Sequence, residues 1–212
     1  MTASSNKPHF YSNWAEFISD VISPPVVWAI MAFVIAGRDA NSAGEAITWA
    51  LIYITLLSVI PTLYILIQVR RGNITDMHMP LREERIRPFF VAIASGILAI
   101  LLFSAIGASV WMRVFMISSL VQLILMALIT TMWQISVHTM CISAALATIA
   151  LMFNASIALL LAPLIVIVAL ARLRLHRHTL SQVVAGIVVG GVSVGVLLGL
   201  AGLLDPSLWA HR

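Results

Sequence analysis

The chain has 212 residues, of which 61% are hydrophobic and only 9% are charged. Because a typical soluble domain carries about 25% charged residues, this composition excludes a water-soluble enzyme, a disordered chain and a secreted disulfide scaffold. The formal net charge is +4, and the basic residues stand between apolar runs, which favours anionic lipid or a phosphate substrate over nucleic acid.

Long apolar runs between the charged residues predict membrane-spanning helices, each of which needs about 20 residues. Seven helices are expected, at 15–37, 45–69, 89–108, 113–133, 138–153, 155–171 and 180–204. The fifth is short and follows from dividing the uncharged run 114–171 near Trp133 and Asn154. We therefore expect an all-α, polytopic transmembrane helical bundle that forms one domain over 13–212, behind an N-terminal tail at 1–12.

Proline, tryptophan and glycine add detail to these helices. Pro24 and Pro25 mark an irregular start to the first apolar run. Pro61 and Pro163 lie inside predicted helices and should kink them. Tryptophans near helix ends predict an aromatic belt at the headgroup level: Trp14, Trp49, Trp111, Trp133 and Trp209. Small residues at spacings of four in the last helix predict close packing along one face: Gly186, Gly190, Gly191, Gly195, Gly199 and Gly202.

Each helix that crosses the membrane moves the chain to the other side. With seven crossings, three polar segments therefore lie on the same side, which we call the polar end. These segments are 70–88, 133–138 and 172–178, and the N-terminus lies on the same side. Nine basic residues fall there: Lys7, Arg70, Arg71, Arg82, Arg85, Arg87, Arg172, Arg174 and Arg177. Three fall on the other side: Arg38, Arg113 and Arg212. Because cytoplasmic loops carry an excess of Lys and Arg, the count favours a cytoplasmic polar end.

The residue types at the polar end are those of phosphoryl chemistry. Arginine forks bind phosphate oxygens bidentately and stay charged, and histidine can be a nucleophile toward phosphorus or a general acid near neutral pH. The acidic residues form no paired-aspartate motif and Cys141 is the single cysteine, so we expect no metal and no cofactor. The simpler alternative is that the arginines only set membrane orientation and that His138 is an interfacial residue.

Three short motifs at the polar end follow one another in the chain. They are Arg87-Pro88, Ile135-Ser136-Val137-His138, and Arg172 separated by five residues from His178. In this order they resemble the three signatures of the type-2 phosphatidic acid phosphatase superfamily, whose second signature is usually Pro-Ser-Gly-His. The resemblance covers roughly 45–204 and implies a six-helix phosphatase-like core with one additional N-terminal helix.

The resemblance also implies roles for individual residues. His178 would be the nucleophile that forms a phosphohistidine, and His138 would be the general acid for the leaving group. Arg172 and Arg87 would hold the phosphoryl oxygens, and Ser136 would add a hydrogen bond.

Two positions depart from the family pattern. The family's first signature begins with a lysine seven residues before its arginine, where this chain has Pro80; Arg82 or Arg85 can supply that charge. The family has an acidic residue four positions after the nucleophilic histidine, where this chain has Gln182. Glutamine can orient the ring from the same helix face, but it cannot stabilise imidazolium with a full charge. Alternatively, Gln182 forms a capping box with Thr179 at the start of the last helix.

Together these features predict a metal-independent integral membrane phosphatase that acts on a lipid phosphate or a polyprenyl (pyro)phosphate. Its expected partners are this phosphorylated lipid and the lipids of a plasma (inner) membrane, without nucleic acid. The alternative is a catalytically weak or inactive relative that binds or carries a phosphorylated lipid, which Gln182 and Pro80 support. A transporter is disfavoured because its polar residues would gather at the midplane rather than at one end.

Overall fold

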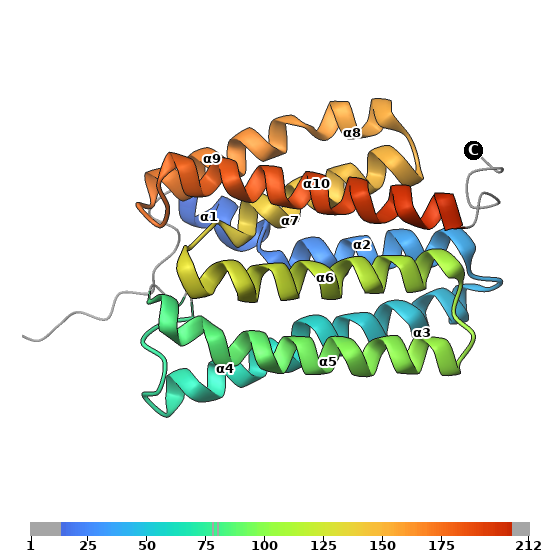
Figure 1. Ribbon diagram of the computed structural model, residues 1–212, viewed down its shortest axis with the longest axis horizontal. Coiled ribbons are helices and arrows are strands. Elements are labelled where there is room, and N and C mark those ends of the chain that lie inside the picture. The colour runs from blue at the N-terminus through green and yellow to red at the C-terminus, as the bar shows by residue number, and fades with distance from the viewer. Residues whose placement is uncertain (1–13, 78, 80, 205–212) are drawn as a thin grey trace, which may run out of the picture.

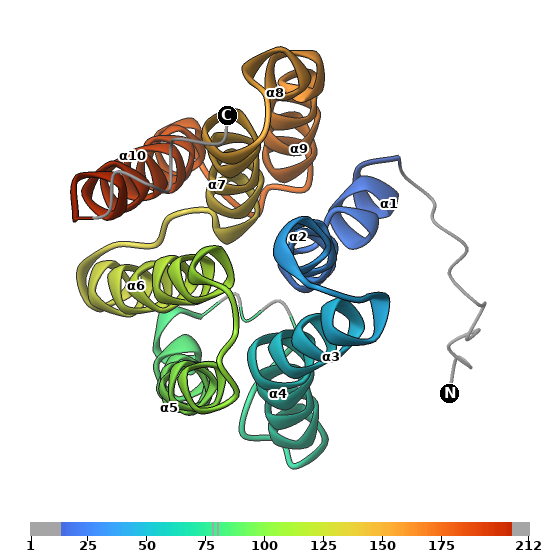
Figure 2. The same ribbon diagram turned by 90° about the vertical axis from the view of Figure 1, so that its right-hand side faces the viewer.

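The computed structural model describes residues 14–77, 79 and 81–204. Over these residues the chain is a bundle of helices without strands (Figures 1 and 2). Within this described part of the chain, five helices are long and apolar enough to cross a membrane, or six when the bent pair Trp14–Val21 and Pro24–Asp39 is one span. With the shorter apolar helix Val137–Met152 they make seven helical segments, so the predicted polytopic all-α bundle is confirmed. The predicted tail at 1–12 lies outside the described residues.

The seven segments follow the predicted ranges closely. In chain order they are α1 (Trp14–Val21) with α2 (Pro24–Asp39); α3 (Ala43–Ile54) with the π-helical turn η1 (Thr55–Val59) and α4 (Ile60–Arg70); the 3₁₀ turn η2 (Arg82–Arg85) with α5 (Ile86–Ala105); α6 (Val110–Met132); α7 (Val137–Met152); α8 (Ala155–Leu161) with α9 (Pro163–Arg174); and α10 (Leu180–Leu204).

Prolines stand at the breaks inside these segments. Pro24 and Pro25 open α2 after Ser23, where the chain bends by 42° relative to α1. Pro61 is the second residue of α4, which begins directly after the π-helical turn. A proline removes a backbone donor and its ring crowds the preceding turn of a regular helix, and the wider π-helical turn accommodates both effects. Pro163 begins α9 after α8 has ended at Leu161. The sequence predicted these irregularities from the prolines alone.

Helices α7 and α10 pack closely because two glycines leave room for the α7 backbone. A Cβ atom added at Gly186 would lie 2.5 Å from the Thr139 hydroxyl oxygen, and one at Gly190 would overlap the Met140 carbonyl. The predicted packing face is therefore confirmed at these two positions. It is wrong for Gly195 and Gly199, where an added Cβ would meet nothing within 4 Å.

At the end of the bundle opposite the polar end, buried aromatic rings replace part of the predicted aromatic belt. Trp49 and Trp111 are only 4% and 6% exposed, so for them the prediction of headgroup-level tryptophans is wrong. The guanidinium of Arg38 lies 5.1 Å from the Trp111 ring centre and also donates to the Met152 carbonyl. This arginine therefore ties α2 to α6 and α7.

The α4–α5, α6–α7 and α9–α10 loops lie at the same end of the bundle, at the left in Figure 1. Helix α1 lies at this end as well and packs against α9. The loops carry the three polar segments that helix parity placed together. The fold thus gathers the basic and histidine residues of distant segments around one end of an apolar bundle.

Candidate active site

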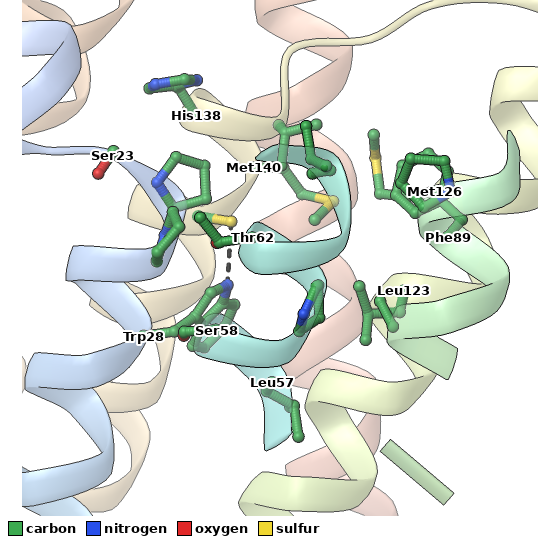
Figure 3. A pocket seen from close by; sticks show the side chains of 18 of the residues that line it. Ser23, Trp28, Leu57, Ser58, Thr62, Phe89, Leu123, Met126, His138 and Met140 are labelled. Atoms are coloured by element: carbon green, nitrogen blue, oxygen red, sulfur yellow. Dashed lines mark hydrogen bonds between the residues drawn. The ribbon is translucent and has the colours of Figure 1, made fainter. Parts of the chain in front are cut away.

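A cavity of about 330 Å³ extends from the polar end into the bundle, bounded by α2, α4, α5, α6 and α7. The charged and histidine side chains that line it are Asp20, Arg85, His138, Arg172 and His178. In Figure 3, His138 lies at one end of the pocket and Leu57 at the other, with Trp28 and Ser58 at a similar level between them. Four of the residues predicted from the sequence are therefore brought into one cavity: Arg85, His138, Arg172 and His178.

The hydrogen bonds of Gln182 define the tautomer of His178. The Gln182 side-chain oxygen accepts from the backbone N–H of Thr179 at 3.0 Å, so the oxygen and not the NH₂ group faces this corner. The same oxygen lies 3.3 Å from Nδ1 of His178. Because an amide oxygen can only accept, Nδ1 carries the proton, and the lone pair of the neutral ring is on Nε2. Gln182 thus fulfils both roles that the sequence left as alternatives.

The surroundings of His178 keep its ring neutral. Burial first, and then the positive charges of Arg172 and Arg85, lower the pKa of His178 to about 4, although the hydrogen bond that His178 donates to Gln182 opposes this shift. The side chain is 8% exposed. At neutral pH the ring is therefore neutral, with its proton on Nδ1 and a lone pair on Nε2, as a nucleophile requires.

Ser19 on α1 connects Arg172 with His138. Its hydroxyl oxygen accepts a 2.5 Å hydrogen bond from Nη1 of Arg172. Its backbone carbonyl lies 3.1 Å from Nε2 of His138, which must be the donor because a carbonyl oxygen only accepts. Arg172 is 3% exposed, and its Nε has no hydrogen-bond partner among the described residues. The guanidinium therefore keeps a donor for an oxyanion.

Sequence reasoning missed the contribution of α1. Ser19 and Asp20 both line the cavity, although no motif includes them. The available signal was indirect, because helix parity already placed the start of the chain at the polar end.

Arg85 is the second arginine of the cavity. It is 7% exposed, and its Nε donates to the Met79 carbonyl at 2.9 Å. With the Gln134 amide oriented to satisfy both groups, the Gln134 oxygen accepts from Nη2 of Arg85 at 2.6 Å. These bonds fix a buried positive charge beside Arg172 and His178.

Three further predicted residues lie outside the cavity lining. Arg87 is exposed and lines a separate cleft between α4 and the loop before α5. Arg82 donates to the Met132 carbonyl at 3.0 Å and pairs with Glu83 at 3.5 Å, at the surface. Ser136 is fully buried and caps α7, accepting from the Thr139 N–H at 3.4 Å. Its backbone N–H donates to the Gln182 carbonyl, so Ser136 supports the site structurally.

No family model, no curated protein and no solved structure matches this chain. The likeness of the three motifs to the phosphatidic acid phosphatase signatures therefore stays a prediction. The geometry of the cavity is the basis for the function proposed below.

Proposed function

We propose that this protein is an integral membrane phosphatase that removes phosphate from a lipid phosphate or a polyprenyl (pyro)phosphate through a phosphohistidine. The observation that carries the proposal is the single cavity that joins His138, His178, Arg85 and Arg172 to an apolar interior. Such a cavity can hold an anionic head at the polar end while the lipid tail stays among apolar side chains.

The first chemical step uses the lone pair that the Gln182 contact leaves on Nε2 of His178. This atom attacks phosphorus, and the bond between phosphorus and the lipid oxygen breaks. In this scheme His138 begins as an imidazolium, gives its Nε2 proton to the lipid oxygen as the general acid and is left as a neutral ring. In the second step His138 accepts a proton from water, whose oxygen attacks phosphorus and breaks the phosphorus–nitrogen bond. Inorganic phosphate leaves, and both histidines return to their starting states.

The two arginines supply most of the electrostatic stabilisation in this scheme. Phosphoryl transfer develops charge on the equatorial oxygens, and fixed positive charges aimed at those oxygens lower the barrier. Arg85 and Arg172 are buried, so water screens their charge poorly. The first amides of α10, beside His178, add the favourable field of a helix N-terminus.

A second candidate function is binding or transport of a phosphorylated lipid without turnover. Gln182 favours it, because the partner of His178 is an uncharged amide. In serine proteases, loss of the orienting carboxylate's charge costs about 10⁴ in rate. A comparable loss here would leave a protein that binds phosphate through Arg85 and Arg172 but turns over very slowly.

The decisive experiment measures phosphate release by the purified protein in detergent with EDTA. The substrates are phosphatidate, phosphatidylglycerol phosphate and a polyprenyl pyrophosphate. We expect release from at least one of them, inhibition by vanadate, and loss of release in His178→Asn. The matched control is His176→Asn, because His176 is exposed two residues away and asparagine tolerates its φ of 52°. Release that persists in His178→Asn, or that requires a metal, would refute the histidine mechanism.

We also propose a plasma membrane location with the polar end in the cytoplasm, following the excess of basic residues at that end. Asn73 is exposed in the α4–α5 loop, and the native Cys141 is buried. An Asn73→Cys protein should therefore resist a membrane-impermeant thiol reagent in intact cells and react after lysis. Labelling in intact cells would contradict this orientation.

A further inference from the structure

The cavity continues well beyond the charged residues, and its inner part has hydrogen-bonding side chains among apolar ones. Gln122 lines this part from α6, ten residues before the helix ends at Met132, which corresponds to about 15 Å along the axis. Ser58 lines it from the π-helical turn η1. The apolar lining around them includes Trp28, Leu57 and Leu123 (Figure 3).

Gln122 and Ser58 are buried polar groups that the protein does not satisfy. Gln122 is 2% exposed, and neither its side-chain oxygen nor its nitrogen has a partner among the described residues. Ser58 is 7% exposed, and its hydroxyl also lacks a partner within that part of the chain. Unpaired polar groups inside a membrane-spanning bundle are costly, so those that also line a cavity point to a ligand.

Two other buried hydroxyls in the same cavity are satisfied. The hydroxyls of Tyr53 and Ser119 lie 2.7 Å apart and bond to one another, and Ser119 also donates to the Phe115 carbonyl at 3.0 Å. The protein thus pairs some of its inner polar groups and leaves Gln122 and Ser58 available.

The π-helical turn contributes to this arrangement. Leu57 and Ser58 are adjacent in sequence, yet both line the cavity. Both residues belong to the π-helical turn, and π-helical turns occur frequently at functional sites. Figure 3 shows both side chains on this turn, further inside the pocket than His138.

We propose that this inner compartment binds the ester linkages of a glycerolipid phosphate, with the Gln122 amide and the Ser58 hydroxyl donating to acyl carbonyl oxygens. The inference rests on the proposed function, and it selects among the substrates named there. A diacylglycerol phosphate has two ester carbonyls between its phosphate and its tails, and these can accept hydrogen bonds inside the cavity. A polyprenyl chain offers no acceptor in this region and would leave both groups unpaired.

The test compares phosphatidate with its dialkyl ether analogue of the same chain length, which keeps the phosphate and tails but lacks the carbonyls. Leaving a buried donor unpaired corresponds to a factor of roughly 5 to 150, so wild-type protein should prefer the diester by this factor in kcat/KM. Gln122→Leu should reduce the preference, and Gln122→Leu combined with Ser58→Ala should bring it close to one, in both cases by lowering kcat/KM for the diester alone.

Thr130→Val is the matched control. Thr130 lies on the same helix, is 1% exposed, and has a hydroxyl without a partner among the described residues, but it is not part of the cavity lining. Both variants remove an unpaired buried polar group, so both should fold and keep or raise the thermal midpoint. Only Gln122→Leu should change the diester preference.

The outcomes separate the two proposals. Equal kcat/KM for diester and diether in wild type, or a preference that Gln122→Leu leaves unchanged, would overturn the inner compartment while phosphatase activity stands. If no lipid is hydrolysed, the proposed function fails. The inner compartment is then tested by the affinities of the His178→Asn protein for the diester and the diether. Equal affinities in that measurement would overturn the inner compartment as well.

Discussion

Replacing Gln182 by glutamate tests how the site controls its nucleophile. The side-chain oxygen lies 3.3 Å from Nδ1 of His178, so Gln182→Glu would place a carboxylate there with almost no change in shape. At an effective dielectric constant of about 20, opposite unit charges about 4 Å apart attract by roughly 4 kcal/mol. One pKa unit corresponds to about 1.36 kcal/mol, so the pKa of His178 should rise by about 3.

The pH dependence of kcat/KM gives the readout. Attack requires neutral His178, so the rate falls as pH falls through the pKa of this ring. In wild-type protein that acid limb should lie at about pH 4, the pKa that burial, Arg172 and Arg85 produce. In Gln182→Glu it should move toward about pH 7. Above that limb the variant should turn over faster, because the carboxylate stabilises the imidazolium of the phosphoenzyme.

Ser181→Glu is the control, because it adds the same negative charge nearby without the contact to the His178 ring. Ser181 is exposed in the same first turn of α10, and its hydroxyl lies 3.0 Å from that of Thr179. This variant should leave the acid limb near its wild-type position. An unchanged limb in Gln182→Glu, or an equal shift in Ser181→Glu, would refute the contact between position 182 and the ring.

Two further variants test the arginine assignment and the helix packing. Arg85→Lys should lower kcat/KM by roughly 10- to 100-fold, since it weakens a charged hydrogen bond to the phosphoryl group, while Arg87→Lys should change it little; equal losses in the two steady-state assays would contradict the cavity assignment. Gly190→Ala should destabilise the protein by about 1–3 kcal/mol, because its Cβ would overlap the α7 backbone, whereas Gly199→Ala should be neutral. Thermal unfolding in detergent would measure this difference, and equal midpoints would argue against the tight α7–α10 contact.

The helices were predictable because a membrane leaves few solutions for an apolar chain. Charges cannot lie in the hydrocarbon region, so uncharged runs define the spans, and parity then assigns every loop to a side. This reasoning placed His138, Arg172 and His178 at one end. It holds even for α7, although that helix is only 16 residues long.

The rotation of side chains around each helix was not predictable in the same way. Arg85 and Arg87 are two residues apart, which is about 200° around a helix, so one faces the cavity and the other the surface. The motif likeness pointed to Arg87, and only the fold distinguishes the two. Gln122 was a further signal in the sequence, because an amide in the middle of an apolar membrane-spanning helix is itself evidence of a functional site.

The π-helical turn at Thr55–Val59 also constrains how this chain can change in length. Such a turn holds one residue more than the α-helical turn it replaces, so removing a residue from it would restore a regular helix. All of α3 would then rotate by about 100° relative to α4. Trp49, Ala50 and Tyr53, now buried, would leave their partners in α2 and α6. The extra residue therefore sets the rotation of α3 relative to α4 about the axis of this span. Relatives of the protein should tolerate substitutions in the turn more readily than deletions.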